Sequence, residues 1–323
     1  MENCAYIIAE IGINHEGSLD ACKSMIEAAA RCNVDAVKLQ TVDAEENYVK
    51  GTESYNIFKC AELTQEETSK AFDYARECNL EIFTTAGDAN TVNWVNKLNP
   101  SHWKISSGLL THIPIIEHIA SLGKPLLLST GMSDAREIGL AIEVAKSNGA
   151  VDITLLQCTS IYPTPTSEIN LSAIGWLKEK YGLPVGFSDH SDGDDAVFLS
   201  IAAGASVIEK HFSLDVNRSG FDHRVSLDEA GMKKMVERVR LAEAIMGDKE
   251  KKISKEVKVA RGRFLRYIVA TAAIQEGELF TKKNVGVKRT FPGCSGIRPE
   301  DIDNILGRVS DRVYKIDDII LAH

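Results

Sequence analysis

Two histidines stand at matching places in the chain and are candidates for binding a divalent metal ion. His190 and His211 each come at the end of a short apolar run. Imidazole nitrogens and nearby carboxylates, here Asp189 and Glu209, are ligands that such ions take in proteins. A lone histidine more often makes ordinary hydrogen bonds, so it is the pair that favours a metal site.

Two lysines interrupt runs that otherwise read as buried strands. Lys38 follows Ala36-Val37 and Lys104 follows Trp103. Burying an ammonium group without a partner is costly, so we expect an anion between them. Serine hydroxyls would add donors suited to a phosphate and a carboxylate, from Ser107, Ser129 and Ser188. Two alternatives stay open, because the lysines could instead pair with Glu10 and Glu209, or one could form a Schiff base.

The elements that must position these residues alternate between short strands and longer helices as far as residue 247. Eight compact apolar runs predict parallel strands buried on both faces, at residues 6–11, 35–40, 81–85, 102–107, 125–130, 152–158, 184–189 and 206–211. Helical patterns lie at residues 19–32, 65–79, 134–148, 194–203 and 227–246. This order predicts an α/β fold, a (β/α)₈ TIM barrel. A dinucleotide-binding sheet is disfavoured, because residues 11–17 lack the G-x-G-x-x-G pattern.

In such a barrel the carboxyl ends of the strands converge on one mouth, where enzymes of this fold carry their active sites. Residues at those ends are polar or ionisable, namely Glu10, Lys38, Gln40, Thr85, Lys104, Ser106, Ser107, Ser129, Gln157, Ser188, His190, Glu209 and His211. Stability alone does not require this concentration of polar side chains. We therefore predict a catalytic site at the mouth.

The pattern changes after the barrel, which we place at residues 1–247. Residues 248–263 carry many charges and few large apolar side chains, which predicts a linker. Residues 264–323 combine short apolar runs with close turns, which predicts a small β-rich domain. Its length is near the lower limit for independent folding, so we expect it to pack against the barrel or a second copy of the chain.

The composition argues against several other classes of protein. The 323 residues include 37 Lys and Arg against 46 Asp and Glu, without a dense basic block beside aromatics, so nucleic-acid binding is not expected. The N-terminus matches neither a signal peptide nor a membrane span. Seven cysteines without a C-x-x-C pair predict reduced thiols that fill core positions. We expect a cytoplasmic protein with no membrane partner.

Several ordered motifs together resemble the N-acetylneuraminate (sialic acid) synthase family, which includes legionaminate and pseudaminate synthases and a spore-coat polysaccharide branch. The motifs are AEIGINHEG at 9–17, VKLQ at 37–40, KISSG at 104–108, LSTGM at 128–132, IYPTP at 161–165, GFSDH at 186–190 and IEKHF at 208–212. Residues 264–323 resemble the antifreeze-protein-like (SAF) domain that ends these enzymes. The resemblance thus spans nearly the whole chain.

The resemblance implies a reaction between phosphoenolpyruvate and an N-acylated hexose such as N-acetylmannosamine, with release of phosphate by C–O cleavage. It implies that His190 and His211 bind a divalent metal, Mn²⁺ first, with Mg²⁺ or Co²⁺ as alternatives. It implies that phosphoenolpyruvate is held by Lys38, Thr85, Lys104, Ser107, Ser129 and Ser188. The reacting carbons and the acceptor would be surrounded by Glu10, Gln40, Tyr162, Glu209 and Asp222, with Glu10, Glu209 and Lys104 as catalytic residues. Arg289 would enter the barrel of a second chain to meet the N-acyl group, which implies a domain-swapped homodimer.

Three positions depart from the family pattern, and they bear on the acceptor sugar. They are Leu109 in place of a common glutamate, Ser160 in place of asparagine, and Ala86 in place of proline. A legionaminate- or pseudaminate-type synthase, which uses a 2,4-diacetamido-trideoxyhexose, is therefore an alternative.

More distant alternatives are a phosphoenolpyruvate-dependent synthase of another ulosonic acid, a metal-dependent aldolase that uses pyruvate, and a carbohydrate-binding scaffold with a relict site. The first would need a second basic cluster for a sugar phosphate, and the sequence shows none. A scaffold would be expected to lack one of the histidines or lysines, and all of them are present.

Overall fold

The computed structural model describes residues 4–248 and 250–322, and the chain divides into two compact units between Gly247 and Asp248. Unit 1 is a closed barrel of eight parallel strands, in which β8 also pairs with β1. The strands lie where the apolar runs predicted them, to within two residues at each end: β1 (Tyr6–Gly12), β2 (Ala36–Gln40), β3 (Glu81–Thr85), β4 (Trp103–Ile105), β5 (Leu126–Ser129), β6 (Ile153–Cys158), β7 (Val185–Asp189) and β8 (Val207–His211). The predicted TIM barrel is confirmed.

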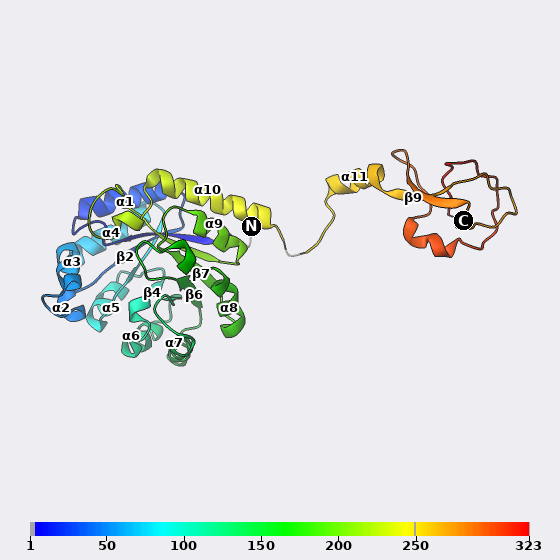
Figure 1. Ribbon diagram of the computed structural model, residues 1–323. Coiled ribbons are helices and arrows are strands. Elements are labelled where there is room, and N and C mark those ends of the chain that lie inside the picture. The colour runs from blue at the N-terminus through cyan, green and yellow to red at the C-terminus, as the bar shows by residue number, and fades with distance from the viewer. Residues whose placement is uncertain (1–3, 249, 323) are drawn as a thin grey trace. The chain divides into compact units, whose positions relative to one another are not determined.

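Helices surround the strands of unit 1, as Figure 1 shows. They are α1 (Leu19–Arg31), α2 (Ala44–Asn47), α3 (Glu53–Ala61), α4 (Gln65–Glu77), α5 (Ala89–Asn96), α6 (Ile113–Ala120), α7 (Ala135–Ser147), α8 (Ser172–Tyr181), α9 (Asp195–Ala202) and α10 (Glu229–Met246). The five predicted helices correspond to α1, α4, α7, α9 and α10. The connection between β2 and β3 also contains α2 and α3, two short helices that the sequence patterns did not reveal.

Local sequence signals explain where several helices begin. Thr64 precedes α4, and its hydroxyl accepts the N–H of Glu67 while the Glu67 carboxylate accepts the N–H of Thr64. Asp134 and Glu137 form the same reciprocal capping box at the start of α7. Each cap satisfies N–H groups that have no partner within the helix and contributes about 1 kcal/mol. The helices then pack their apolar faces against the outer face of the barrel in one continuous core.

The inside of the barrel changes from apolar to polar along its axis. An apolar layer consists of Ile8, Ala36, Phe83, Leu127, Leu156 and Val207. Side chains on one face of a strand recur every second residue, so the next inward residues lie two positions further along each strand. They are Glu10, Lys38, Thr85, Ser129, Cys158 and Glu209. The strand period itself therefore places the polar residues together at the carboxyl ends.

Unit 2 has its own small core and a two-stranded antiparallel sheet. In it β9 (Arg266–Ala270) pairs with β10 (Val285–Arg289). The core consists of Ile268, Ala270, Ile274, Phe280, Val285, Ile305, Tyr314 and Ile320. The predicted small β-rich domain is confirmed.

The predicted linker at residues 248–263 contains a helix in its second half, α11 (Lys255–Phe264). Ser254 begins this helix, because its hydroxyl accepts the N–H of Val257 at 3.1 Å. None of the residues of α11 is buried, so no apolar periodicity marks the helix in the sequence.

The structure bears on two sequence predictions, that the chain does not span a membrane and that its cysteines are reduced. In the part of the chain that the structure describes, no helix has both the length and the apolar character needed to cross a bilayer. All seven cysteines are free thiols.

Candidate active site

Four charged side chains from four strands meet inside the mouth of the barrel. Lys38 Nζ on β2 lies 2.8 Å from Glu10 Oε1 on β1 and 3.7 Å from Glu209 Oε2 on β8. Lys104 Nζ on β4 reaches across the barrel to Glu209 Oε1 at 3.3 Å. All four side chains are buried, and a buried charge needs such a partner. The sequence left open whether the lysines pair with Glu10 and Glu209, and in the structure they do.

Burial and ion pairing act in opposite directions on these groups. Burial lowers the pKa of Lys38, but the adjacent Glu10 and Glu209 carboxylates outweigh it, and the pKa lies above its ordinary value. Burial also lowers the pKa of Lys104, and there Glu209 does not compensate, so the pKa lies below its ordinary value. Burial raises the pKa of Glu209, but Lys104, Lys38 and the Ser188 hydroxyl together bring it to about 2. Glu209 is therefore anionic at any physiological pH, and Lys104 is the lysine that releases a proton more readily.

Hydroxyl groups line the same mouth. Ser188 Oγ donates to Glu209 Oε1 at 2.9 Å, and Thr85 Oγ1 accepts from Lys38 Nζ at 3.5 Å. Ser107 Oγ accepts the N–H of Gly131 at 3.0 Å. Ser129 Oγ is buried and has no hydrogen-bond partner among the described residues. Buried hydroxyls are rarely left unpaired, so Ser129 points to a place for a ligand oxygen.

His190 and His211 lie side by side, with ring centroids 5.3 Å apart. His190 Nδ1 donates to Thr159 O at 3.0 Å, which leaves Nε2 as the nitrogen with a free lone pair. His211 Nδ1 is buried without a hydrogen-bond partner among the described residues and lies 3.7 Å from Asp222 Oδ2. The ring of Tyr162 covers both, at 4.1 Å and 6.0 Å between centroids. Burial and the neighbouring imidazole lower the pKa of His190 to about 3, so it is in the neutral form that binds metals.

Of the two carboxylates expected near this pair, Asp189 lies elsewhere and Glu209 has other partners. Asp189 faces the outer side of the barrel, where its Oδ2 lies 2.7 Å from Lys210 Nζ, so the expectation that it lies near the metal site is wrong. Glu209 is bound to the lysines instead. Within residues 4–248 and 250–322, no three His, Cys, Asp or Glu side chains are grouped as metal ligands. The histidine pair would thus leave most positions around an ion to water or substrate, and an open position is what distinguishes a catalytic metal site from a structural one.

The loop after β8 is held in place by a residue that follows β1. Asn14 Nδ2 donates to Phe212 O at 2.9 Å and to Ser226 Oγ at 3.0 Å, and its Oδ1 accepts the N–H of Asp222 at 3.0 Å. These three hydrogen bonds are buried or partly buried. They determine where Asp222 stands beside the histidine pair.

Asp222 and Tyr162 also line a pocket of about 270 Å³ formed mainly by residues 218–225. Arg218 and Arg224 line the same pocket, although the sequence showed no second basic cluster. Arg218 Nη2 is already paired with Glu16 Oε1 at 2.7 Å. A pocket of this size next to the histidines accommodates part of a small ligand.

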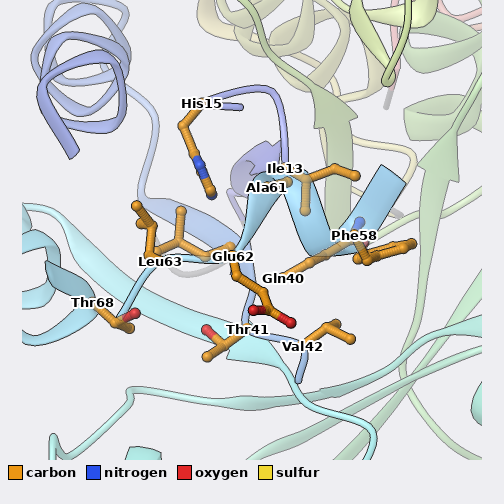
Figure 2. A pocket seen from close by; sticks show the side chains of 11 residues that line it. Ile13, His15, Gln40, Thr41, Val42, Phe58, Ala61, Glu62, Leu63 and Thr68 are labelled. Carbon is orange, nitrogen blue, oxygen red and sulfur yellow. The ribbon is translucent and has the colours of Figure 1, made fainter. Parts of the chain in front are cut away.

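A much smaller cavity lies next to Gln40, and Figure 2 shows the side chains that line it. Its volume of about 10 Å³ holds no more than about one water molecule. His15, Gln40 and Glu62 are among its lining residues, whereas no buried lysine or paired histidine is. Burial lowers the pKa of His15 to about 4, and its Nδ1 accepts the N–H of Gly17 at 3.2 Å. We assign this cavity to local packing behind Gln40, whose Nε2 donates to the mouth carboxylate of Glu10 at 2.9 Å.

The structure brings the unit 1 residues of the predicted site to the mouth: Glu10, Lys38, Gln40, Thr85, Lys104, Ser107, Ser129, Tyr162, Ser188, His190, Glu209, His211 and Asp222. Their roles stay predictions. Arg289 ends β10 in unit 2, where its guanidinium lies 5.0 Å from the ring of Phe264, and its entry into another barrel also stays a prediction. The placement of Gln157 at the mouth is wrong, because its Nε2 donates outward to Ile169 O at 3.2 Å.

The three positions that depart from the family pattern have different surroundings. Ala86 is part of the buried core outside the barrel, and Leu109 packs against that core. Ser160 stands at the mouth, where its hydroxyl would be 2.7 Å from a Cβ added at Gly131.

Sequence reasoning missed Cys158, which it treated as a core filler. Cys158 Sγ lies 3.6 Å from His190 Nδ1 and accepts from Ser107 Oγ at 3.7 Å. The alternation along β6 carried the signal, because Leu156 faces inward and Cys158 is two residues further on.

This barrel and mouth can be compared with known proteins. A model of the NeuB family matches residues 25–251, and a model of the SAF domain matches residues 266–323. The chain belongs to the NeuB family, which confirms the resemblance seen in the sequence motifs.

Relatives cover nearly the whole chain. An uncharacterised protein of Methanocaldococcus jannaschii is 42% identical over 98% of this chain and 93% of its own length. The N,N'-diacetyllegionaminic acid synthase of Campylobacter jejuni is 36% identical over 97% of this chain and 98% of its own. Among solved structures, the N-acetylneuraminic acid synthetase of Leptospira borgpetersenii in complex with citrate superposes with a TM-score of 0.77 at 32% identity, covering 79% of this chain and 90% of that one. The named relatives are thus synthases of nonulosonic acids.

Proposed function

We propose that this protein condenses phosphoenolpyruvate with an N-acylated hexose, forming a carbon–carbon bond and releasing phosphate to give a nonulosonic acid. The observation that carries the proposal is the pair of buried lysines that shares one barrel mouth with several hydroxyls and two adjacent histidines. Membership of the NeuB family supports it, because the named relatives make acids of this class.

Phosphoenolpyruvate carries a phosphate and a carboxylate, and the mouth offers donors for both. Lys38 and Lys104 approach from different strands, so each ammonium can meet one end of the molecule. The unpaired hydroxyl of Ser129 would donate to a phosphate or carboxylate oxygen. Ser107, Thr85 and Ser188 would add further donors, which requires that the Ser188 hydroxyl turn away from Glu209.

We assign His190 and His211 as ligands of a divalent metal ion, Mn²⁺ first, with Mg²⁺ or Co²⁺ as alternatives. Both side chains fit this role, because His190 is neutral with Nε2 free and His211 Nδ1 is buried without a hydrogen-bond partner among the described residues. Two imidazoles with water and substrate oxygens around them make a mixed nitrogen and oxygen site. When bound, the ion supplies Lewis acidity for the aldehyde oxygen of the open-chain acceptor.

The side chains of the mouth then have defined tasks. Lys38 and Lys104 hold phosphoenolpyruvate so that its carbon 3 attacks the aldehyde carbon, whose oxygen gains a proton. The new bond leaves positive charge at carbon 2, which the carboxylates of Glu10 and Glu209 stabilise. Water adds at carbon 2 and gives up a proton, and the tetrahedral intermediate expels inorganic phosphate by C–O cleavage to leave a 2-keto acid.

Glu10 is the better candidate for the base that activates the water. Its Oε2, like that of Glu209, is buried without a hydrogen-bond partner among the described residues, so a water molecule has an acceptor there. Glu209, with a pKa of about 2, is too weak a base to take up a proton readily near neutral pH. We therefore assign stabilisation of the cation chiefly to Glu209 and proton transfer to Glu10.

For the acceptor we favour a 2,4-diacetamido-trideoxyhexose, with N-acetylmannosamine as the alternative. Leu109 stands where the family pattern has a glutamate, and an apolar side chain cannot accept a hydrogen bond from a sugar hydroxyl, which suits a deoxygenated sugar. Relatives from two organisms that are 36% and 35% identical bear the name N,N'-diacetyllegionaminic acid synthase. Gln40, Tyr162 and Asp222 are the side chains that would contact this acceptor.

We further propose that the chain acts as a domain-swapped homodimer in the cytoplasm, in which Arg289 of one copy contacts the N-acyl group in the barrel of the other. Arg289 is exposed at the end of β10 and is therefore accessible to such a contact. The charges of the two units are complementary, since Lys and Arg outnumber Asp and Glu in unit 2 and the reverse holds in unit 1. Opposite net charges favour contact between a unit 2 and a barrel.

Release of inorganic phosphate tests the proposed reaction. The purified enzyme is mixed with phosphoenolpyruvate, Mn²⁺ and one acceptor: a 2,4-diacetamido-trideoxyhexose, N-acetylmannosamine or N-acetylmannosamine 6-phosphate. We expect phosphate release only with an acylated sugar, fastest with the first, abolished by EDTA and restored by Mn²⁺. Lys104→Met should lower the rate at least about 100-fold because it removes a charge-assisted contact at the reacting molecule.

The matched control is Lys146→Met, which removes an exposed lysine at the end of α7 and should leave the rate unchanged. Absence of phosphate release with every acylated hexose would contradict the proposal. Faster release with the 6-phosphate would instead assign Arg218 and Arg224 to a phosphorylated acceptor.

A further inference from the structure

A fully buried ion pair lies on the outer face of the barrel, away from the mouth. Lys210 Nζ on β8 is 2.7 Å from Asp189 Oδ2 on β7, and their side chains are 0% and 1% exposed. The two residues are direct partners in the β7–β8 ladder. Their neighbours Ser188 and Glu209 face the mouth, so the period of two turns Asp189 and Lys210 outward. None of the catalytic tasks assigned above uses this pair.

The Asp189–Lys210 ion pair is hydrogen-bonded to the backbone next to His190. Lys210 Nζ also donates to Ser191 O at 2.5 Å. The Ser191 N–H in turn donates to Asp189 Oδ1 at 2.9 Å. Asp189, which precedes His190, and Ser191, which follows it, are therefore both bound to Lys210 at the point where the chain leaves β7.

Packing alone does not explain charged residues at this place. Most of the outer face of the barrel is covered by apolar side chains that pack against the helices. An apolar pair of similar volume is often as stable as a buried ion pair, or more so, because two charges need not be desolvated. What an apolar pair cannot do is hold a carbonyl and an N–H of the turn after β7 in fixed directions.

We propose that Lys210 and Asp189 are positioning residues that hold His190 beside His211 for binding the divalent metal ion. This inference rests on the proposed function, because it takes the two histidines as metal ligands. Neither residue touches the ion or a substrate. Loss of the pair should weaken binding of Mn²⁺ but not of phosphoenolpyruvate. The lysines that hold the latter stand on β2 and β4, and Ser188, its proposed contact on β7, faces the mouth and is bound to Glu209.

The test compares full-length variants in two binding measurements. Lys210→Met removes the ammonium group, and the double variant Asp189→Asn/Lys210→Met also removes the carboxylate that would be left without a partner. Electron paramagnetic resonance of free Mn²⁺ measures the dissociation constant of the ion. Calorimetry at saturating Mn²⁺ measures phosphoenolpyruvate binding, and circular dichroism verifies folding.

Two reference variants complete the set. His190→Ala removes a proposed ligand and should abolish most Mn²⁺ binding. Arg31→Met breaks an ion pair between helices α1 and α10, where Arg31 Nη2 lies 2.7 Å from Glu229 Oε2, and should leave Mn²⁺ binding unchanged. It thus controls for the loss of an ion pair that does not bind the turn around His190.

We expect both Lys210 variants to bind Mn²⁺ at least about tenfold more weakly than the wild type, because outer-shell changes have effects of this size. Their phosphoenolpyruvate affinity should match the wild type once Mn²⁺ is saturating, and added Mn²⁺ should restore activity. Wild-type Mn²⁺ affinity in either folded variant would overturn the inference. So would equal weakening of both ligands, or failure of both variants to fold, since each points to a general structural role.

The His190→Ala variant distinguishes failure of the positioning role from failure of the proposed function. If the wild type binds no Mn²⁺, or if His190→Ala binds it equally well, the metal assignment falls and the inference falls with it. If His190→Ala loses Mn²⁺ while the Lys210 variants keep it, only the positioning role is refuted.

Discussion

Replacement of Glu209 by glutamine preserves the shape of a buried side chain and removes a charge that two lysines share. One carboxylate oxygen accepts from Ser188 at 2.9 Å and from Lys104 at 3.3 Å, and the other lies 3.7 Å from Lys38. In Glu209→Gln the amide oxygen can keep the first two hydrogen bonds. The amide NH₂ group then faces the Lys38 ammonium, so a donor meets a cation. The variant therefore isolates the contribution of the negative charge.

The pKa of Glu209, about 2, determines the size of the effect. An unfolded glutamate has a pKa of about 4.3, so the ionised form stabilises the folded protein by about 3 kcal/mol at pH 7. Because the pKa is lower in the folded state, this contribution is complete above the unfolded pKa and declines as the pH falls toward 2. About half of it is left at pH 3. Removal of one partner from a buried ion pair has a cost of similar size, about 3–5 kcal/mol.

Tryptophan fluorescence during urea unfolding can measure this loss in unit 1 alone. Trp94, Trp103 and Trp176 are the tryptophans of the chain, and all lie in unit 1. We expect Glu209→Gln to lower the free energy of unfolding by about 3 kcal/mol at pH 7 and by about half as much at pH 3. Glu66→Gln is the matched control, because it removes a carboxylate paired with Lys70 on the exposed side of α4 and should unfold like the wild type.

Two outcomes would refute this reasoning. A loss below about 1 kcal/mol at pH 7 would mean that the charge of Glu209 is not needed by the lysines, whatever their distances. An equal loss at pH 7 and pH 3 would mean that the effect comes from packing of the amide and not from ionisation.

Two further substitutions test the positions of neighbouring groups. In Gly131→Ala the added carbon would lie 2.9 Å from both Cys158 Sγ and Ser107 Oγ, so the proposed phosphoenolpyruvate contact Ser107 must shift. Calorimetry should therefore show weaker binding of phosphoenolpyruvate. Gly139→Ala is the control, because its added carbon meets only a ring carbon at 3.8 Å, and it should bind phosphoenolpyruvate like the wild type. Asn14→Ala removes three hydrogen bonds to the loop that carries Asp222, so unit 1 should lose about 2–3 kcal/mol of stability. Its KM for the acceptor sugar should rise while its KM for phosphoenolpyruvate stays constant, and an equal rise in both would contradict the assignment of this loop to the acceptor.

The strands of the barrel were predictable because each is a compact apolar run between helical patterns. The direction of their side chains was predictable too, but only where the period of two was followed. Gln157 was placed at the mouth, and Asp189 near the metal site, because both are polar and near a strand end. The alternation along β6 and β7 sends both of them outward and sends Cys158 inward. Polarity near a strand end is thus a weaker signal than the position of the residue in the alternation.

The ion pairs of the mouth depend on strand register and barrel closure, which no local pattern reveals. Glu10 and Lys38 meet because they are direct partners in the ladder between β1 and β2. Lys104 and Glu209 stand on β4 and β8, which do not pair with each other, and they meet only across the interior of the closed barrel. The helix α11 was missed for a different reason, since none of its residues is buried and no apolar stripe marks it.

Under the proposed reaction, the charges at the mouth favour the transition state over the bound substrate. Lys38 and Lys104 attract the anionic phosphoenolpyruvate, whereas Glu10 and Glu209 repel it. As the carbon–carbon bond forms, positive charge develops at carbon 2, and the interaction with the same two carboxylates becomes attractive. Interactions that are stronger in the transition state than in the ground state are those that accelerate a reaction. A site built only to bind an anion would have no use for two buried carboxylates beside its lysines, so their presence favours catalysis over binding as the purpose of the mouth.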